Sequence, residues 1–332
     1  MSIGKKQLNS AYIVVCYHYI RPVINDPFPR ILGVRQDIFM EHVRILKKAF
    51  RVMALAEVID GAPGNVSRRT KEPGLLFSFD DGLADHYAAA KILAEHGISA
   101  IFFIPTCILI EKEPINPVII HHCLSRYGIA RFLKMYRQAL EECGLSFNVF
   151  PIFFRPGADD PIAVIQAIKK IFKYQMQHGD ARRVLRFIYE NSLKRDVKDV
   201  FKMLHLTHDQ VAEMVEMGHT IGAHTHSHLS VASAHLSEEN FEKEVLAPKQ
   251  YLEREFGTQV VSFSYPFGES QDFTGAVDRL RQSGTYRLAF TVENKLNIID
   301  TSPLMLGRHT VHSADSAEKI LSDLQELYEE QA

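Results

Sequence analysis

The chain has 332 residues, of which 46% are hydrophobic and 23% are charged, and its formal net charge is -2. This balance of charge excludes the broad basic field that attracts nucleic acid or anionic lipid, and no apolar stretch reaches the about 18 residues of a membrane-spanning helix. We therefore expect a globular protein that neither binds nucleic acid nor spans a membrane.

The first predicted element is a strand, the apolar run AYIVVC at residues 11–16, which Tyr17 and His18 follow. The run is too short for the apolar core of a signal peptide, so we expect a buried strand and a cytoplasmic protein. The cysteines form no CxxC pair, which predicts free thiols. They are Cys16, Cys107, Cys123 and Cys143.

A second predicted strand, GLLFSF at residues 74–79, ends in Asp80 and Asp81. Residues 83–97 then have apolar side chains at helical spacing and a terminal glycine, and residues 98–105 read as another strand. A strand, a helix and a strand in this order predict an α/β core with parallel strands, either a barrel or an open sheet. Sites in such folds lie where the strands end.

Residues 107–205 differ from the rest, because they contain amphipathic helices separated by proline and glycine signals. We interpret this stretch as a helical insertion or cap between the first part of the core, residues 10–106, and the second part, residues 206–332. The insertion could cap the site, form an oligomer interface or bind a partner, and the sequence does not choose among these roles or predict an oligomeric state.

The second part of the core repeats the alternation of strands and helices. Thr207 is the predicted cap of a helix that Gly218 ends, and residues 219–224 form a predicted strand. The elements expected after it are a helix at 238–257, a strand at 260–268, a helix at 273–284, a strand at 286–292 and a helix at 317–330.

The adjacent Asp80 and Asp81 require explanation, because two like charges beside a buried strand are unfavourable without a cation or a shared proton. The alternative is that one of them caps the following helix. Possible partners lie in HTHSH at residues 224–228. In a strand all three histidines share a face, whereas in a helical turn His224 and His228 converge and His226 points elsewhere.

The glycine before HTHSH and the SVAS after it favour a turn. Two imidazoles and one carboxylate form the three-ligand site, with one open position, that is typical of catalytic zinc. Asp81, His224 and His228 are therefore the predicted metal ligands.

FSFDDG at residues 77–82 and HTHSH at residues 224–228 resemble the first two motifs of the NodB-type polysaccharide deacetylases, which remove acetyl groups from glycans. The resemblance covers residues 10–105 and 205–312. It implies an α/β fold, a distorted (β/α) barrel of seven or eight strands with a helical insertion. It also implies a divalent metal on Asp81, His224 and His228, zinc before cobalt, nickel or manganese, and Asp80 as the base for a metal-bound water.

SYPFG at residues 264–268 resembles the third motif, in which Pro266, Phe267 and Gly268 form the loop that binds the substrate and the oxyanion. Ser264 stands where the family usually has an arginine. The fourth motif has no counterpart, since the chain contains 0 tryptophans.

The last motif supplies a histidine general acid, for which His309 and His312 are the candidates. Arg308 could replace the missing arginine as the partner of Asp80, and ordinary positions at a strand end are the alternative for Arg308 and His309.

Supporting roles are predicted for a few more polar residues. The hydroxyl of Thr225 could bond the backbone of a ligand, and His18 resembles a position at the first strand of one branch of the family. His226 is expected to point away from the metal. Four further histidines have no convergent partner in the sequence and are interpreted as hydrogen-bonded core residues: His86, His121, His122 and His219.

Three functions remain open. The first is a metal-dependent hydrolase that removes the acetyl group of an N-acetylated sugar, glycan or glycan precursor. The second is a deformylase or other amidohydrolase that acts on a nucleotide- or lipid-linked sugar. The third is a non-catalytic carbohydrate-binding relative, which the intact Asp80, Asp81, His224 and His228 argue against.

Overall fold

A parallel β-sheet forms the centre of the computed structural model, which describes residues 11–60 and 73–331. Ser10 and Ala332, the outer limits of the predicted domains, lie outside the described residues. The strands in spatial order are β10 (His309–Thr310), β1 (Tyr12–Tyr17), β5 (Gly74–Phe79), β6 (Ile101–Ile104), β7 (Thr220–Ala223), β8 (Ser262–Ser264) and β9 (Leu288–Phe290), and β4 (Arg51–Val52) pairs with the start of β5.

The sheet curls into a barrel. Residues 303–306 bond to β9, with the N–H of Leu306 donating to the carbonyl of Ala289 at 2.9 Å and the N–H of Ala289 donating to Pro303 at 2.8 Å. The same segment runs on into β10, which pairs with β1. The predicted distorted barrel of seven or eight strands is therefore confirmed.

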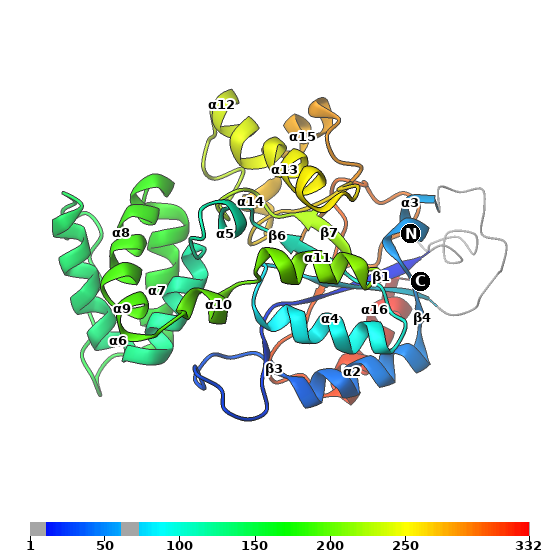
Figure 1. The fold of residues 1–332 in the computed structure, drawn as a ribbon, viewed down its shortest axis with the longest axis horizontal. Helices are drawn as coiled ribbons and strands as arrows, with labels where there is room; N and C mark the ends of the chain where they lie inside the picture. The colour runs from blue at the N-terminus through cyan, green and yellow to red at the C-terminus, as the bar shows by residue number, and fades with distance from the viewer. Residues whose placement is uncertain (1–10, 61–72, 332) are drawn as a thin grey trace.

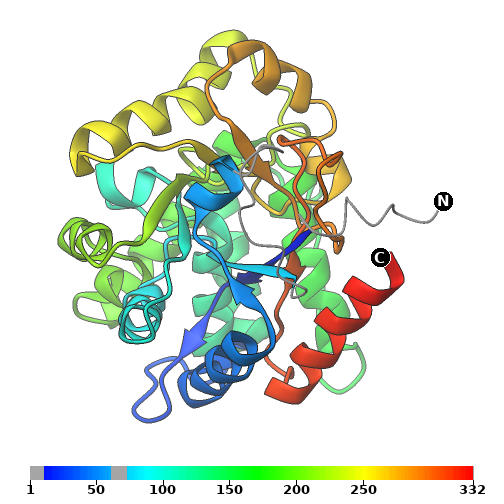
Figure 2. The same ribbon diagram turned by 90° about the vertical axis from the view of Figure 1, so that its right-hand side faces the viewer.

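Helices surround the barrel (Figures 1 and 2). The last helix, α16, packs against α2, the first long one. These helices are α2 (Gln36–Ala49), α3 (Leu55–Asp60), α4 (Asp85–Glu95), α11 (His208–Glu216), α12 (Glu238–Phe241), the π-helical turn η2 (Glu242–Leu246), α13 (Ala247–Phe256), α14 (Ser270–Phe273), α15 (Val277–Ser283) and α16 (Ala317–Gln331).

Several local predictions agree with the structure. Thr207 is the N-cap of α11, where its hydroxyl accepts the N–H of Gln210 and the Gln210 side chain accepts the N–H of Thr207. The four cysteines are free. The sequence interpretation did not cover residues 20–60, which hold α2, α3 and a small pair of parallel strands, β2 (Ile20–Arg21) and β3 (Val34–Arg35).

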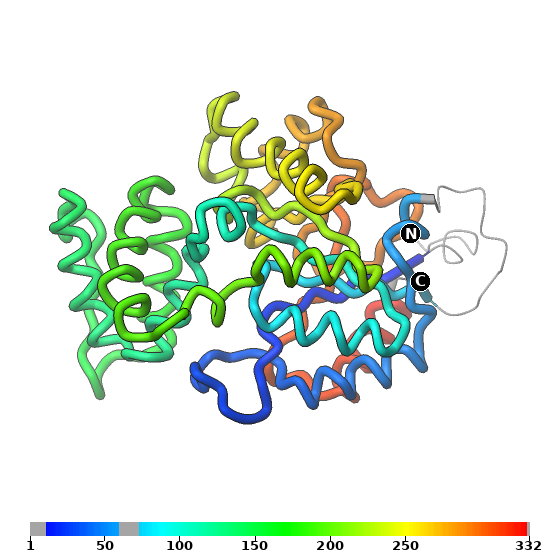
Figure 3. Tube along the Cα trace, viewed as in Figure 1, coloured from blue at the N-terminus to red at the C-terminus, as the bar shows by residue number. Residues whose placement is uncertain are grey.

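The helical segment between β6 and α11 forms a separate lobe at one end of the barrel (Figures 1 and 3). No helix in the described parts of the chain is both long enough and apolar enough to cross a bilayer. The segment consists of α5 (Cys107–Ile110), α6 (Asn116–Glu142) with a break at Gly128, α7 (Pro161–Lys170), the π-helical turn η1 (Ile171–Gln175), α8 (His178–Asn191), α9 (Leu193–Asp196) and α10 (Val200–Leu204).

The barrel interior changes from apolar to polar along each strand. The layer farther from the carboxyl ends of the strands is a buried apolar cluster that includes Val14, Leu76, Phe103 and Phe290. Side chains alternate between the two faces of a strand, so the inward series that starts at Leu76 continues with Ser78 and Asp80. The carboxyl end of the barrel therefore receives polar side chains, as in other barrels with parallel strands.

Candidate functional site

The two aspartates at the end of β5 take different directions. Asp80 continues the inward alternation of the strand, whereas Asp81 has a φ of 82° and Gly82 a φ of 56°. This turn moves the Asp81 carboxylate toward β7. Neither aspartate caps α4, because the N-cap of that helix is Ala84 and no side chain bonds its first turn.

The histidine loop follows β7 without forming a helical turn, so that part of the prediction was wrong. Thr225 has a φ of 57° and His228 a φ of 58°, and these two left-handed residues turn the loop. The rings of His224 and His228 are nevertheless brought together, with centroids 4.9 Å apart. The hydroxyl of Thr225 accepts the backbone N–H of His228 at 2.9 Å and fixes the turn.

Three predicted ligand atoms converge. The Nε2 atoms of His224 and His228 lie 3.4 Å and 2.9 Å from Oδ1 of Asp81. Burial favours a raised pKa for Asp81, but His228 and His224 outweigh it and hold the pKa well below its usual range. The three residues are buried, and Oδ1 of Asp81 makes no hydrogen bond within the described chain.

These residues fit a divalent metal by their donor chemistry. Nδ1 of His224 lies 2.8 Å from the carbonyl oxygen of Ser264, to which it donates. In neutral His224 this bond leaves a lone pair on Nε2, the atom that faces Asp81. Two imidazole nitrogens and a carboxylate oxygen then point at one place, and all three atoms lie within 4.8 Å of one another.

His226 points away from this cluster into a buried network. Its Nδ1 lies 2.9 Å from the hydroxyl of Thr106, and its Nε2 lies 3.0 Å from a carboxylate oxygen of Glu111. The residue is only 8% exposed, so His226 is a structural residue and does not face solvent.

Asp80 is held by Arg308 inside the barrel. Two nitrogens of the guanidinium donate to the two carboxylate oxygens at 2.8 Å and 2.7 Å. The hydroxyl of Ser264 accepts from Arg308 at 2.9 Å and donates to Asp80 at 3.1 Å. Burial favours a raised pKa for Asp80, but the charge of Arg308 lowers it far below the usual value, so the carboxylate is ionised.

Arg308 is 0% exposed, which excludes a surface position. The structure thus places Arg308, which directly precedes β10, beside Ser264, the serine that stands where the resembled family usually has an arginine. The pairing of an arginine with Asp80 is therefore made by Arg308 and not by residue 264.

His309 does not reach the site, and its assignment as the general acid was wrong. It follows Arg308 directly, and adjacent side chains of a strand point to opposite faces. His309 therefore turns outward, where its Nδ1 lies 3.2 Å from the side-chain oxygen of Asn294. Charges of α16, including Asp323 and Lys319, are its electrostatic neighbours.

The loop at residues 264–268 borders the cluster of Asp81, His224 and His228. The ring of Phe267 lies 4.8 Å from that of His228 in an edge arrangement, and both Phe267 and Gly268 have positive φ, 65° and 66°. A side chain at Gly268 would meet the backbone nitrogen of Val292 at 2.9 Å, so the close approach requires glycine.

Backbone strain is concentrated around the cavity that Asp81 and His228 line. Asp81, Thr225, His228 and Phe267 are four of the eight non-glycine residues with positive φ in the described parts of the chain. Each such residue costs about 1–3 kcal/mol and persists where the surroundings enforce it, most often at functional sites. The strained residues therefore identify the same candidate site as the converging side-chain atoms of Asp81, His224 and His228.

A cavity of about 650 Å³ opens above Asp80, Asp81, His224 and His228. His18 lies on its wall, and its ring has a nitrogen within 4.8 Å of a carboxylate oxygen of Asp80. His121, expected to be an ordinary core histidine, lines the cavity as well. His86, His122 and His219 do bond backbone carbonyls in the core, at 2.9, 2.8 and 2.9 Å.

The sequence interpretation missed the contribution of the helical segment to this cavity. Lys169, Lys173, Tyr174 and His178 come from α7, η1 and α8, and all line it. The ammonium group of Lys173 lies 3.2 Å from the buried Asp272 and 4.1 Å from the ring centroid of Phe267. No spacing relation links these residues to the motifs, so the sequence offered no signal for them.

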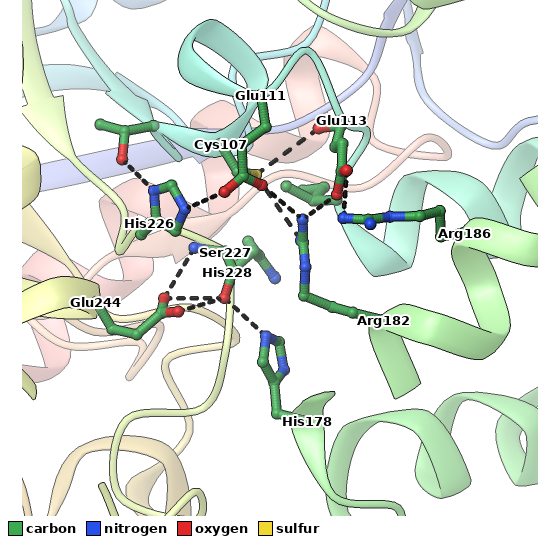
Figure 4. Close-up of polar contacts among 12 residues, drawn as sticks. Cys107, Glu111, Glu113, His178, Arg182, Arg186, His226, Ser227, His228 and Glu244 are labelled. Atoms are coloured by element: carbon green, nitrogen blue, oxygen red, sulfur yellow. Dashed lines mark hydrogen bonds and ion pairs between the residues drawn. The ribbon is translucent and has the colours of Figure 1, made fainter. Parts of the chain in front are cut away.

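A polar network fastens α8 to the histidine loop (Figure 4). Nε2 of His178 lies 2.7 Å from the hydroxyl of Ser227, and that hydroxyl donates to Glu244 at 2.9 Å. Because Ser227 has given away its only proton, His178 must be the donor. Burial lowers the pKa of His178 to about 3, so the ring is neutral and its Nδ1 is an acceptor.

Arg182 extends this network to the loop after α5. It donates to Glu113 at 2.6 Å and to Glu111 at 3.2 Å, and Arg186 also pairs with Glu113. Since Glu111 in turn bonds His226, the helical lobe is tied to His226 and Ser227, which lie between His224 and His228 in the sequence. The wall of the cavity is therefore held in place by the same contacts that hold the histidine loop.

Part of this chain matches a known protein family in sequence. Residues 183–285 match a family model described as polysaccharide deacetylase, a span that contains both the histidine loop and residues 264–268. No curated protein matches the chain in sequence.

Three solved structures have a similar fold. The Streptococcus pyogenes deacetylase PplD in complex with acetate has 16% identity and a TM-score of 0.56, over 94% of this chain and 97% of that one. IcaB from Ammonifex degensii has 16% identity and a TM-score of 0.54, over 95% and 97% of the two chains. A de-N-acetylase from Aggregatibacter actinomycetemcomitans has 16% identity and a TM-score of 0.53, over 95% and 100%. This chain is therefore similar to polysaccharide deacetylases over residues 183–285 of its sequence, and it shares its fold with solved deacetylase structures.

Proposed function

We propose that this chain hydrolyses the acetyl group of an N-acetylated sugar, with a divalent metal on Asp81, His224 and His228 and with Asp80 as the general base. One observation carries the proposal: the ligand atoms converge in the same cavity as a buried aspartate that an arginine holds in place. A cation at this place would acidify a water molecule and polarise the acetyl carbonyl.

Asp80 is suited to accept a proton but is a weak base. Arg308 and Ser264 fix the direction of its carboxylate, and Arg308 lowers its pKa, which keeps it ionised at the expense of basicity. A base of low pKa can act only on an acidified water. This requirement explains why Asp80 and the three donor atoms belong to one mechanism.

The developing oxyanion needs donors on the opposite side of the carbonyl. We propose the backbone N–H of Phe267 for this role, because the left-handed turn at Phe267 and Gly268 borders the cavity next to His228. Neutral His178 presents Nδ1 as an acceptor for a sugar hydroxyl. In PplD the same fold binds acetate, the product expected from this reaction.

The test is acetate release from N-acetylated sugars by the purified protein, before and after removal of metal with a chelator. We expect the chelated protein to lose activity and to regain it when zinc or cobalt is added. N-formyl sugars measured in parallel address the alternative of a deformylase. A metal-free protein that retains full activity would remove the metal from the mechanism.

Thr225 offers a finer test of the ligand loop. Thr225→Val removes the hydroxyl that accepts the N–H of His228, and loss of a group that orients a ligand lowers metal affinity by about 10–100-fold. Thr225→Ser keeps the hydroxyl and is the matched control. Competition with a chelator measures both, and equal affinities for the two variants would contradict the role of the hydroxyl.

A further inference from the structure

The wall that the helical segment contributes to the cavity is rich in lysine. Lys169, Lys170 and Lys173 line the cavity together with Gln166, at a spacing that places them on one helical face. The wall is not a mobile surface. Lys173 and Tyr174 contact the buried Asp272 at 3.2 Å each, which docks η1 on the barrel loop.

The charged side chains are distributed unevenly over the walls of the cavity. Asp80 is neutralised by Arg308, and Lys173 is neutralised by Asp272. Lys169 and Lys170 form no ion pair with any residue in 11–60 or 73–331, whereas Lys173 pairs with Asp272 and Glu269. Two unpaired lysines therefore lie on the helical wall of the cavity, whereas the other carboxylates that line it, Asp81 and Glu269, lie on the barrel side.

The environment of Lys169 makes this charge unfavourable in the free protein. The residue is partly buried, and this burial lowers the pKa of its ammonium group. An unpaired charge in a desolvated position costs free energy, and the adjacent positive charge of Lys170 adds repulsion. A bound anion would relieve both effects.

The volume of the cavity and the position of its charges limit the class of ligand that it can bind. A cavity of about 650 Å³ is in the range of about 300–1,000 Å³ that takes a single small ligand. Two free ammonium groups match a phosphate group, which carries a charge of about -1.5 to -2 at neutral pH, better than a carboxylate with a single charge. Lysine binds phosphate as a point charge, whereas a neutral glycan offers nothing to these residues.

We propose that Lys169 and Lys170 form a phosphate subsite, so that the substrate is an N-acetylated sugar carrying a phosphate or diphosphate. The inference rests on the proposed deacetylation, because it assigns the acetyl group to the metal cluster and the phosphate to the helical wall. It gives the helical segment a function, the selection of a charged precursor over a neutral polymer.

The experiment compares kcat/KM for N-acetylglucosamine 1-phosphate and for N-acetylglucosamine, which differ only in the phosphate. We expect the wild-type protein to prefer the phosphorylated sugar by at least about tenfold, the effect of one moderate charged contact. The double variant Lys169→Gln, Lys170→Gln should reduce this ratio by about the same factor. Lys134→Gln removes an exposed lysine from the same helical segment, outside the cavity, and should leave the ratio unchanged.

Sugars linked to UDP and to farnesyl diphosphate separate a nucleotide source of the phosphate from a lipid source. Turnover of neutral N-acetylated sugars without a preference for phosphate would overturn the inference and leave the proposed function intact. If no acetylated sugar is hydrolysed, calorimetry with UDP still decides the matter. UDP binding that the double variant weakens and Lys134→Gln does not supports the subsite, and equal binding to all three proteins, or to none, overturns it.

Discussion

Asp80→Asn should lower kcat by about 10²–10⁴-fold, the usual contribution of a general base, while the protein keeps its metal. The side chain stays the same size, and its amide oxygen can still accept one bond from Arg308, but the group can no longer take a proton. The three proposed ligands are unchanged. The measurement is kcat for acetate release, together with metal content and the folded fraction of the variant.

A matched control for this variant is Asp85→Asn. Asp85 also pairs with a buried arginine, since Arg21 donates to it at 2.9 Å, but it does not line the cavity. This substitution should lower stability and leave kcat per folded molecule close to that of the wild type. Equal kcat values for Asp80→Asn and the wild type would remove Asp80 from the base role.

Arg308→Met should produce the largest loss of stability among these substitutions. It leaves the buried Asp80 charge without its main partner, and breaking such a pair costs about 3–5 kcal/mol. Activity should fall as well, because the direction of the carboxylate is no longer fixed. The free energy of unfolding, measured by urea denaturation, and kcat report the two effects.

The double variant Arg308→Met, Asp80→Asn separates the pair from general damage to the core. With both charges removed, no unpaired charge remains, so its loss of stability should be smaller than the sum of the two single losses. Arg308→Lys provides an intermediate, since lysine keeps the charge but cannot form the two parallel bonds. Strictly additive losses would show that Arg308 and Asp80 do not act as a pair.

Features that depend on periodicity could be predicted from the sequence. Short apolar runs that end in polar residues identified β1 and β5, and β7 was expected after the helix that Gly218 ends; all three lie in one parallel sheet. Since parallel strands end at the same edge, Asp81 and His224 were expected to be close. The convergence of His224 and His228 was expected for the wrong reason, because left-handed residues turn the loop and no helical turn does.

The sequence contained evidence against the prediction that His309 is the general acid. If Arg308 faces inward to meet Asp80, its neighbour on a strand must face outward, so the two roles exclude each other. The contribution of Lys169 and His178 had no such signal. Their position depends on how the helical lobe packs on the barrel, and that packing is set by contacts such as those of Arg182 with Glu113 and of Lys173 with Asp272.

The most direct test of the central claim is the metal content of three purified proteins: the wild type, His228→Ala and His226→Gln. The account predicts about one tightly bound divalent ion per chain in the wild type and in His226→Gln, because His226 bonds Thr106 and Glu111 and does not face Asp81. His228→Ala should lose the ion. A wild-type protein that binds no divalent ion, or a His228→Ala protein that keeps it while His226→Gln loses it, would contradict the account.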